Sequence, residues 1–305
     1  MTLHEDYLSE RCRILCRDIH KESKKSSRKN VFFNPIVGHL KKKDANMGQE
    51  SSQETSVRTQ TDSKAEKPDP VLFLLHGRGG SGKTTLARYM IERAEQAGRP
   101  IIKGDLDRNN STLAHYFKNE ILQPATATDG DVEDCFQAII GQQIETRQSA
   151  VVDFGGGDLT LRNIAFKVSL VDLCADCGIR PVLVHTLAPD RDHLTGLMAL
   201  EKDGLFAPEA TILALNGALI RNGQSHIRAF EDEIISHPDF KKALKRDARA
   251  VLLPILSNIH RLERDRLGFI QATKSTTLGP MDRHIVRRWL ERMQEELSSV
   301  QDWLP

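Results

Sequence analysis

One glycine-rich run constrains this chain more than any other feature of its sequence. It lies at residues 77–84, between a continuous apolar run at 71–75 and a helical pattern at 83–97. Glycines let backbone N–H groups curl around phosphate oxygens, and the start of a helix favours an anion. The run fits G-x-x-x-x-G-K-[ST] throughout and predicts a phosphate-binding loop rather than a chance turn. It reads Gly77-Arg78-Gly79-Gly80-Ser81-Gly82-Lys83-Thr84.

The last residues of this run carry the chemistry. In such a loop Lys83 is expected to reach the β- and γ-phosphates of a nucleotide, and the Thr84 hydroxyl is expected to bind Mg²⁺. Thr85 is expected to lie near the α-phosphate. The sequence therefore predicts a nucleoside triphosphate with Mg²⁺ as ligands.

Apolar runs and helical patterns alternate along the rest of the chain. Strand, helix, strand in repetition is typical of parallel strands joined by crossover helices. We therefore expect an α/β protein with a doubly wound, mainly parallel sheet of the P-loop NTPase class. The expected strands lie at 71–75, 100–102, 149–152, 181–184, 210–215 and 250–253, and the expected helices at 83–97, 131–147, 159–177, 190–201, 226–247 and 255–267.

The chain divides near Pro68 into two parts. Residues 1–67 are expected to form an N-terminal extension, a short helix followed by a disordered linker at 41–67 that is too poor in apolar residues to fold. Residues 68–305 are expected to form the P-loop NTPase domain. That domain ends in a long amphipathic helix from Asp282.

Charge and composition exclude several classes. Lys+Arg number 43 and Asp+Glu 42, so bulk charge does not favour nucleic-acid binding, although a local patch stays open. No apolar run is long enough for a membrane span, and the last helix lacks the net positive charge of a membrane-docking helix. Five cysteines and an N-terminus without an apolar core predict a cytoplasmic protein.

A second candidate element is the strand end Val151-Val152-Asp153 and the glycines that follow it. A carboxylate at that position, beside the phosphate loop, can hold Mg²⁺ through a water molecule. Gly155, Gly156 and Gly157 can contact the γ-phosphate and move on hydrolysis, or they can form an ordinary surface turn.

A third element, Asp105-Leu106-Asp107, follows the strand after the loop's helix. Asp107 is expected to face the γ-phosphate and orient the attacking water. The alternative is that Asp107 or Asn110 caps the helix that starts near Ser111, and one residue can do both.

Together these three elements resemble the ParA/MinD group of P-loop ATPases with a deviant Walker A loop. The order is G-x-G-G-x-G-K-[ST], then D-x-D, then a strand that ends in Asp before glycines, over about residues 71–160. Within the group the chain looks most like the plasmid conjugal-transfer ATPases of the TraL type. The resemblance implies ATP hydrolysis with Mg²⁺ and a role in plasmid transfer or partition.

The resemblance also implies roles for single residues. Arg78 stands where the family has a signature lysine that reaches the partner's nucleotide in an ATP-bound homodimer, and its fork differs from a lysine's point charge. Asp107 matches the water-positioning Asp, and Asp153 matches the Asp near Mg²⁺. Asn216 matches an Asn that contacts adenine. The chain has no Asn-Lys-x-Asp segment, which favours ATP over GTP.

Three functions follow as hypotheses. The first is an ATPase switch in which ATP orders the loops at Asp107 and residues 155–157 for an unidentified protein partner. The second is a small-molecule phosphotransferase, with Asp107 as base and Arg191, Arg221 or Arg228 as a lid. The third is an adaptor in which the nucleotide is structural and residues 1–67 tether a partner.

Overall fold

The structure is a computed structural model that describes residues 69–305, apart from 109, 119, 157–158, 202–203 and 221–225 and the side chains of 226–227. The extension predicted at residues 1–67, with its helix and linker, lies outside the described residues.

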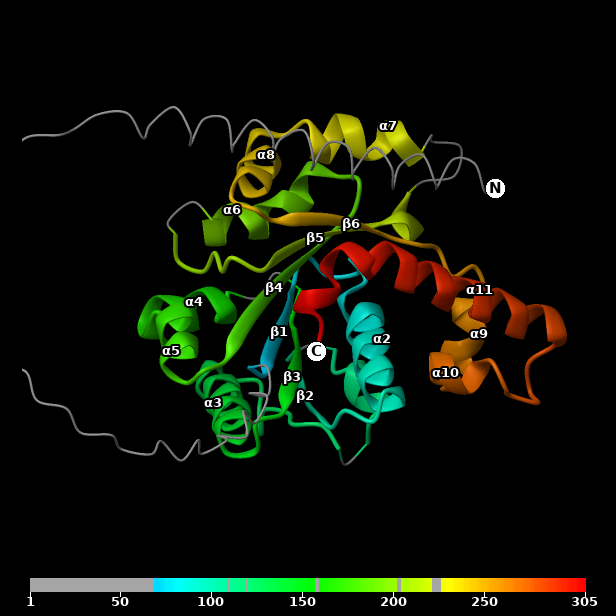
Figure 1. Cartoon of the computed structure of the whole chain (residues 1–305), viewed down its shortest axis with the longest axis horizontal. Helices are drawn as coiled ribbons and strands as arrows, with labels where there is room; N and C mark the ends of the chain where they lie inside the picture. The colour runs from blue at the N-terminus through cyan, green and yellow to red at the C-terminus, as the bar shows by residue number, and fades with distance from the viewer. Residues whose placement is uncertain (1–68, 109, 119, 157–158, 202–203, 221–225) are drawn as a thin grey trace, which may run out of the picture.

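Six strands form one parallel sheet in the order β2-β3-β1-β4-β5-β6 (Figure 1). All five pairings between neighbours are parallel, and each strand overlaps a predicted apolar run. The predicted α/β fold with a parallel sheet is therefore confirmed. The strands are β1 Val71–His76, β2 Ile101–Leu106, β3 Ser149–Phe154, β4 Arg180–Leu187, β5 Thr211–Asn216 and β6 Arg249–Leu253.

Helices cover both faces of the sheet (Figure 1). On one face lie α2 Lys83–Gln96, α9 Ile259–Arg264, α10 Phe269–Ala272, α11 Pro280–Glu296 and the 3₁₀ segment η5 Leu297–Trp303. On the other lie α3 Asp129–Thr146, α4 Thr160–Val168, α5 Leu170–Asp176, α6 Thr195–Glu201, α7 His226–Phe230, the π-helical turn η4 Glu231–Ile235 and α8 Pro238–Lys245. Three 3₁₀ turns, η1 Leu113–His115, η2 Arg191–Leu194 and η3 Gly217–Leu219, lie in the loops.

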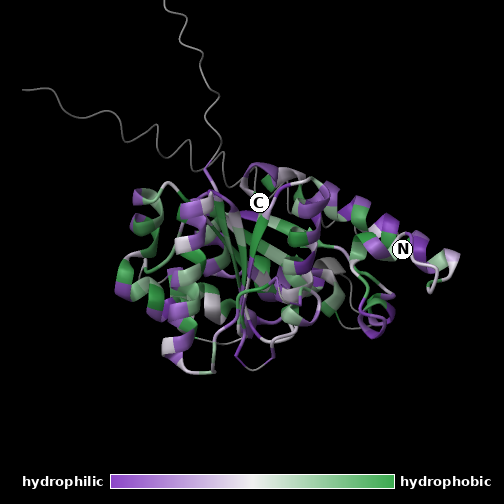
Figure 2. Ribbon diagram, turned by 90° about the horizontal axis from the view of Figure 1, so that it is seen from below, coloured by the Kyte–Doolittle hydropathy of each residue, from purple (hydrophilic) through white to green (hydrophobic). Residues whose placement is uncertain are grey.

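Successive side chains of each strand point to opposite faces of the sheet, which explains why helices must cover both faces. In β1, Phe73 and Leu75 pack with α2 and α11, whereas Leu72 and Leu74 pack with α3 and α4. Successive strand side chains point to opposite faces, so a strand that is apolar throughout must be covered on both. Figure 2 shows the apolar strands in the middle of the molecule and hydrophilic residues on the helices around them.

Several predicted helices are shorter or interrupted in the structure. The segment predicted as one helix at 159–177 breaks at Ser169, whose φ of 45° lies in the left-handed region. The segment at 226–247 breaks before Pro238, because proline restricts the residue before it to extended backbone, as in His237. The last helix ends at Glu296 and continues as the 3₁₀ segment η5.

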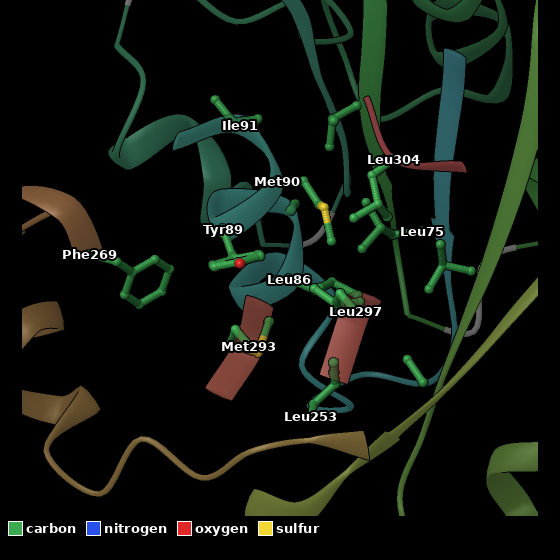
Figure 3. Packing of buried hydrophobic residues seen from close by; sticks show 14 of the residues in the cluster. Leu75, Leu86, Tyr89, Met90, Ile91, Leu253, Phe269, Met293, Leu297 and Leu304 are labelled. Atoms are coloured by element: carbon green, nitrogen blue, oxygen red, sulfur yellow. The ribbon is translucent and has the colours of Figure 1, made fainter. Parts of the chain in front are cut away.

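The C-terminal helix packs on the domain. Figure 3 shows Met293 and Leu297 among Leu75, Leu86 and Met90, and all are buried. No helix of the described residues is both long and apolar enough to cross a membrane.

Candidate nucleotide site

The phosphate loop lies where the strand order reverses. It follows β1, which pairs with β3 on one side and with β4 on the other. The chain first runs outward to β2 and returns to β3, and then continues to β4 across β1. Open α/β sheets bind ligands outside the carboxyl ends of strands at such a switch point. The topology therefore places the loop at the crevice that this fold uses for ligands.

Two glycines in the loop have no room for a side chain. Gly77 and Gly82 have φ of 149° and 98°. A Cβ at Gly82 would lie 2.3 Å from Asn216 Nδ2, and one at Gly77 would lie 2.6 Å from Thr186 Oγ1. The glycines thus permit both a left-handed backbone and a close approach to β4 and β5.

Side chains from the neighbouring strands β4 and β5 form hydrogen bonds with the phosphate loop. The hydroxyls of Ser81 and Thr186 lie 2.5 Å apart, and Asn216 Nδ2 donates to Ser81 O at 2.9 Å. Asn216 Oδ1 accepts from Ala218 N at 3.0 Å. The side chain predicted to contact adenine is therefore engaged at both polar ends with the chain itself, and it supports the loop.

Lys83 is buried inside the loop. Its Nζ donates to Gly77 O at 3.2 Å and to Arg78 O at 3.1 Å. Burial lowers the pKa of Lys83, while the carboxylates of Asp153 and Asp107 oppose that shift. The ammonium group is thus held over the loop, with two acidic side chains near it.

Thr84, at the start of α2, lies against Asp153, near the end of β3. Thr84 Oγ1 donates to Asp153 Oδ2 at 2.6 Å, and Asp153 is 1% exposed. Burial raises the pKa of Asp153 to about 7, and Asp153 Oδ1 is buried without a hydrogen-bond partner. Mg²⁺ is commonly held by one or two carboxylates together with substrate phosphates. A hydroxyl beside a carboxylate with one unused oxygen fits that ion.

The two aspartates of β2 and its following loop differ in role. Asp105 is buried and accepts from Ala114 N at 3.0 Å and from Asp107 N at 3.3 Å, and burial raises its pKa to about 6. Asp107 Oδ1 accepts from Asn110 N at 3.1 Å, and Asp107 also lines the cavity at the loop. Asp105 therefore shapes the turn, whereas Asp107 both caps it and faces the cavity.

Of the predicted site residues, Lys83, Thr84, Thr85 and Asp107 line one cavity of about 370 Å³ together with glycines of the loop, whereas Arg78, Asp153 and Asn216 do not line it. It is open enough for one small ligand. Gly156 lines it and packs against the loop, since a Cβ there would lie 2.3 Å from Gly79 N. Gly157 lies outside the described residues. The described residues around the cavity are Gly79, Gly80, Gly82, Lys83, Thr84, Thr85, Asp107, Asn110 and Gly156.

The side chain of Arg78 lies on the other side of the loop. Its Nη1 donates to Asp192 Oδ2 at 2.8 Å, and both residues line a second cavity of about 370 Å³. That cavity is bounded by the end of β1, by α4 and by α6, with His76, Leu159 and Leu200 among its walls. The structure therefore does not bring the Arg78 guanidinium to the cavity that Asp107 faces.

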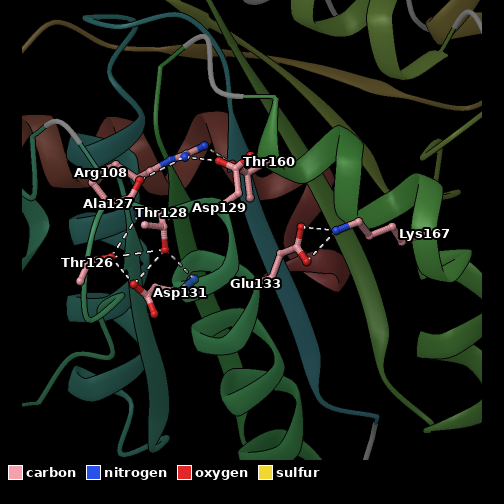
Figure 4. A network of polar contacts seen from close by, with 9 residues as sticks. All are labelled: Arg108, Thr126, Ala127, Thr128, Asp129, Asp131, Glu133, Thr160 and Lys167. Carbon is pink, nitrogen blue, oxygen red and sulfur yellow. Dashed lines mark hydrogen bonds and ion pairs between the residues drawn. The ribbon is translucent and has the colours of Figure 1, made fainter.

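Sequence reasoning missed Arg108, which ties the loops around the site together. Its guanidinium donates to Thr160 Oγ1 at 2.6 Å and Ala127 O at 3.3 Å and pairs with Asp129 (Figure 4). Thr160 is the first residue of α4, just after the glycine turn, and Asp129 is the first of α3. A lone arginine beside Asp107 in the sequence carries no signal of these distant partners.

The other missed residues are Thr186 and Asp192. Both lie in or just after β4, the strand beside β1. Their partners in the phosphate loop are more than 100 positions away in sequence. Only the strand order reveals that the end of β4 lies against the loop.

Fold and site together define an α/β protein of the P-loop NTPase type. The model of the Zeta toxin family matches residues 54–191, which is less than half of the chain. That segment contains the phosphate loop, Asp107 and Asp153. No curated protein matches the sequence significantly.

The solved structures that resemble this fold have low sequence identity to the chain. The chain aligns with MinD of Aquifex aeolicus at 11% identity and a TM-score of 0.44, covering 74% of this chain and 97% of MinD. FtsY of Elizabethkingia anophelis in complex with GDP aligns at 17% identity and a TM-score of 0.36, covering 61% of this chain and 66% of FtsY. This chain thus spans just under two thirds of that FtsY, and 54% of the FtsY of Mycoplasma mycoides.

Proposed function

We propose that the chain binds ATP with Mg²⁺ and hydrolyses it as a nucleotide switch. One observation carries this proposal. Lys83, Thr84 and Asp107 line a single cavity, and Asp153 of a third segment accepts a hydrogen bond from Thr84 beside it. Such a set is what in-line phosphoryl transfer requires, because catalysis there is mainly positioning and charge stabilisation.

Each residue has a role in this mechanism. Lys83 exchanges the carbonyls of Gly77 and Arg78 for phosphate oxygens, and so it brings positive charge to the transferred group. Thr84 and Asp153 hold Mg²⁺, which neutralises charge on the phosphates when bound. Asp107 orients the attacking water and accepts its proton. Gly156, in contact with Gly79, senses whether a γ-phosphate is present.

The nucleotide that is bound can control an exposed apolar surface at α4. The turn that contains Gly156 precedes α4 in the chain, and Leu159 just before this helix and Phe166 within it are exposed apolar residues. A movement of the turn on hydrolysis would move the start of α4. We infer an ATP-dependent homodimer and an unidentified protein partner as the outputs. A solution mass that doubles with ATP but not with ADP is the expected sign of the dimer.

Pathway and location are further parts of the proposal. The resemblance to TraL-type proteins suggests plasmid transfer or partition, and the cysteine content suggests the cytoplasm. Residues 1–67 are proposed as a tether rather than as part of the catalytic domain.

A phosphotransferase is the second candidate function. The second cavity beside Arg78 favours it, because it offers space for an acceptor next to the loop, and so does the match to the Zeta toxin family. Of the proposed lid arginines, Arg191 pairs with Glu233 at 2.9 Å and Arg228 is exposed. Arg221 lies outside the described residues.

The fate of the γ-phosphate separates the two functions. The purified chain is incubated with ATP and Mg²⁺, and ADP and inorganic phosphate are measured in the same samples. Equal amounts of ADP and phosphate, without any added metabolite, support hydrolysis. ADP that forms only when a small molecule is added, without matching phosphate, supports phosphotransfer. Chelation of Mg²⁺ is expected to stop either reaction.

A further inference from the structure

We propose that Asp192 is a positioning residue that sets the discrimination between ATP and ADP by holding Arg78. This inference rests on the proposed function, since it concerns the nucleotide at the same loop. Asp192 takes no part in the chemistry. It acts through the one cationic side chain of the loop that points away from the cavity of Asp107.

The position of Arg78 makes it available to a γ-phosphate. Its carbonyl oxygen accepts from Lys83 Nζ at 3.1 Å, so the residue begins beside the ammonium that is expected to contact the β- and γ-phosphates. Its guanidinium, however, is drawn to Asp192 on the side of the second cavity. To contact a γ-phosphate, Arg78 must leave Asp192.

Asp192 is a fixed acceptor, whereas Arg78 is the flexible partner. Asp190 caps the short turn η2, because its Oδ1 accepts a hydrogen bond from Asp192 N at 2.9 Å. Arg191 in the same turn pairs with Glu233, and Leu194 is fully buried. The carboxylate of Asp192 is thus presented from an anchored turn, at the end of a short side chain.

The pair is weak enough to be exchanged. The side chains of Arg78 and Asp192 are 49% and 71% exposed. Exposed ion pairs change an equilibrium by only about two- to five-fold. A phosphate offers Arg78 a bidentate, doubly charged partner. ATP therefore competes with Asp192 for Arg78, whereas ADP lacks the group that would do so.

It follows that breaking the pair should favour ATP selectively. In the wild type, ATP binding includes the loss of the Arg78–Asp192 contact, and ADP binding does not. The Asp192→Asn variant has no ion pair with Arg78 to lose when ATP binds, and its side chain keeps the same size. Its affinity for a triphosphate should rise by about two- to five-fold relative to its affinity for ADP.

The test is a double-mutant cycle on the full chain. Affinities for AMPPNP with Mg²⁺ and for ADP with Mg²⁺ are measured by calorimetry for the wild type, D192N, R78A and R78A/D192N. We expect the AMPPNP-to-ADP affinity ratio to rise by two- to five-fold in D192N and to stay unchanged when D192N is added to R78A. Asp192→Glu, which keeps the charge, should keep a ratio near that of the wild type.

Two results would overturn the inference while leaving the proposed function intact. One is an unchanged ratio in D192N. The other is the same increase in the wild-type and R78A backgrounds, which would mean that Asp192 repels the nucleotide directly. Failure of the wild type itself to bind either nucleotide overturns the proposed function, and this inference with it. Melting temperatures of all variants show that each is folded.

Discussion

At the scale of single residues, the site depends on side chains that support the loop as much as on those that face the ligand. Asn216 and Thr186 reach the loop from β5 and β4 and fix the position of Ser81. Because both polar ends of Asn216 are engaged, its support of the loop is independent of the base that the nucleotide carries.

Replacement of Asn216 by Ala separates loop support from base recognition. Loss of the hydrogen bond to Ser81 O should weaken binding of ATP and of GTP alike, by about tenfold each. Competition binding with the two nucleotides measures this. A selective loss of ATP affinity, with GTP unchanged, would instead place Asn216 at the adenine.

His185 makes the stability of the fold depend on pH. Its side chain is buried beside His76, with ring centroids 5.4 Å apart, and burial holds the pKa of His185 well below its ordinary value. An unfolded histidine gains a proton as the pH falls below about 6.5, whereas the buried one does not. This residue therefore contributes stability above that pH, and the contribution is lost on acidification.

The His185→Leu variant should reduce this pH dependence. Between pH 7 and pH 5 the wild type should lose up to about 2 kcal/mol more than the variant. The raised pKa values of Asp105 and Asp153 act in the opposite direction and are common to both proteins, so they do not contribute to the difference. Denaturant titrations of both proteins at the two pH values measure this difference. An equal loss of unfolding free energy in the wild type and the variant would contradict the role given to His185.

At the scale of elements, Arg108 joins three segments beside the cavity at the phosphate loop. It connects the loop of Asp107 with the first residues of α3 and α4. The Arg108 side chain is 19% exposed and its contact with Thr160 is partly buried, whereas the Asp129 side chain of the ion pair is 66% exposed.

The Arg108→Ala variant should lower the rate of hydrolysis by about 10- to 100-fold with little change in ATP affinity, because it misplaces Asp107 and the glycine turn. Steady-state kinetics and binding on the same samples measure this. A matched control is Lys167→Ala, which removes another contact between α4 and α3, to Glu133 at 2.6 Å. Equal loss of rate in both variants would point to a general loosening of α4.

The helices and strands can largely be predicted from the sequence, whereas the side-chain contacts between them cannot. Runs such as 71–75 and 149–152 must be covered on both faces, which is why the parallel sheet is predictable. The loop at 77–84 is predictable because it is local. The Arg78–Asp192 pair and the support from Thr186 depend on strand order, and the break at Ser169 depends on one residue in an unusual conformation.

At the scale of the whole molecule, the C-terminal helix closes the core that carries the site. Trp289 of α11 meets Phe269 at a tilt, with ring centroids 4.7 Å apart, and Tyr89 edge to face at 5.7 Å, and its Nε1 donates to Pro254 O at 2.9 Å. Tyr89 belongs to α2, the helix that begins at Lys83. The end of the chain therefore supports the helix of the phosphate loop.

The Trp289→Ala variant should lose about 3–5 kcal/mol of unfolding free energy, a fall in melting temperature of about 6–20 °C. Calorimetry measures it. The control is Met281→Ala on the same helix, which is 77% exposed and should have little effect. Similar small losses in both would mean that α11 is not part of the core.

In the proposed mechanism Asp107 serves the hydrolysis step alone, whereas Lys83 serves nucleotide binding as well as charge stabilisation of the transferred group. The most direct measurement compares ATP binding and single-turnover phosphate release for the wild type, Asp107→Ala and Lys83→Ala with Mg²⁺. Asp107→Ala is expected to bind ATP within about threefold of the wild type but to release phosphate at least about 100-fold more slowly. Lys83→Ala is expected to bind ATP at least about tenfold more weakly. Phosphate release at the wild-type rate by Asp107→Ala would contradict the proposed mechanism.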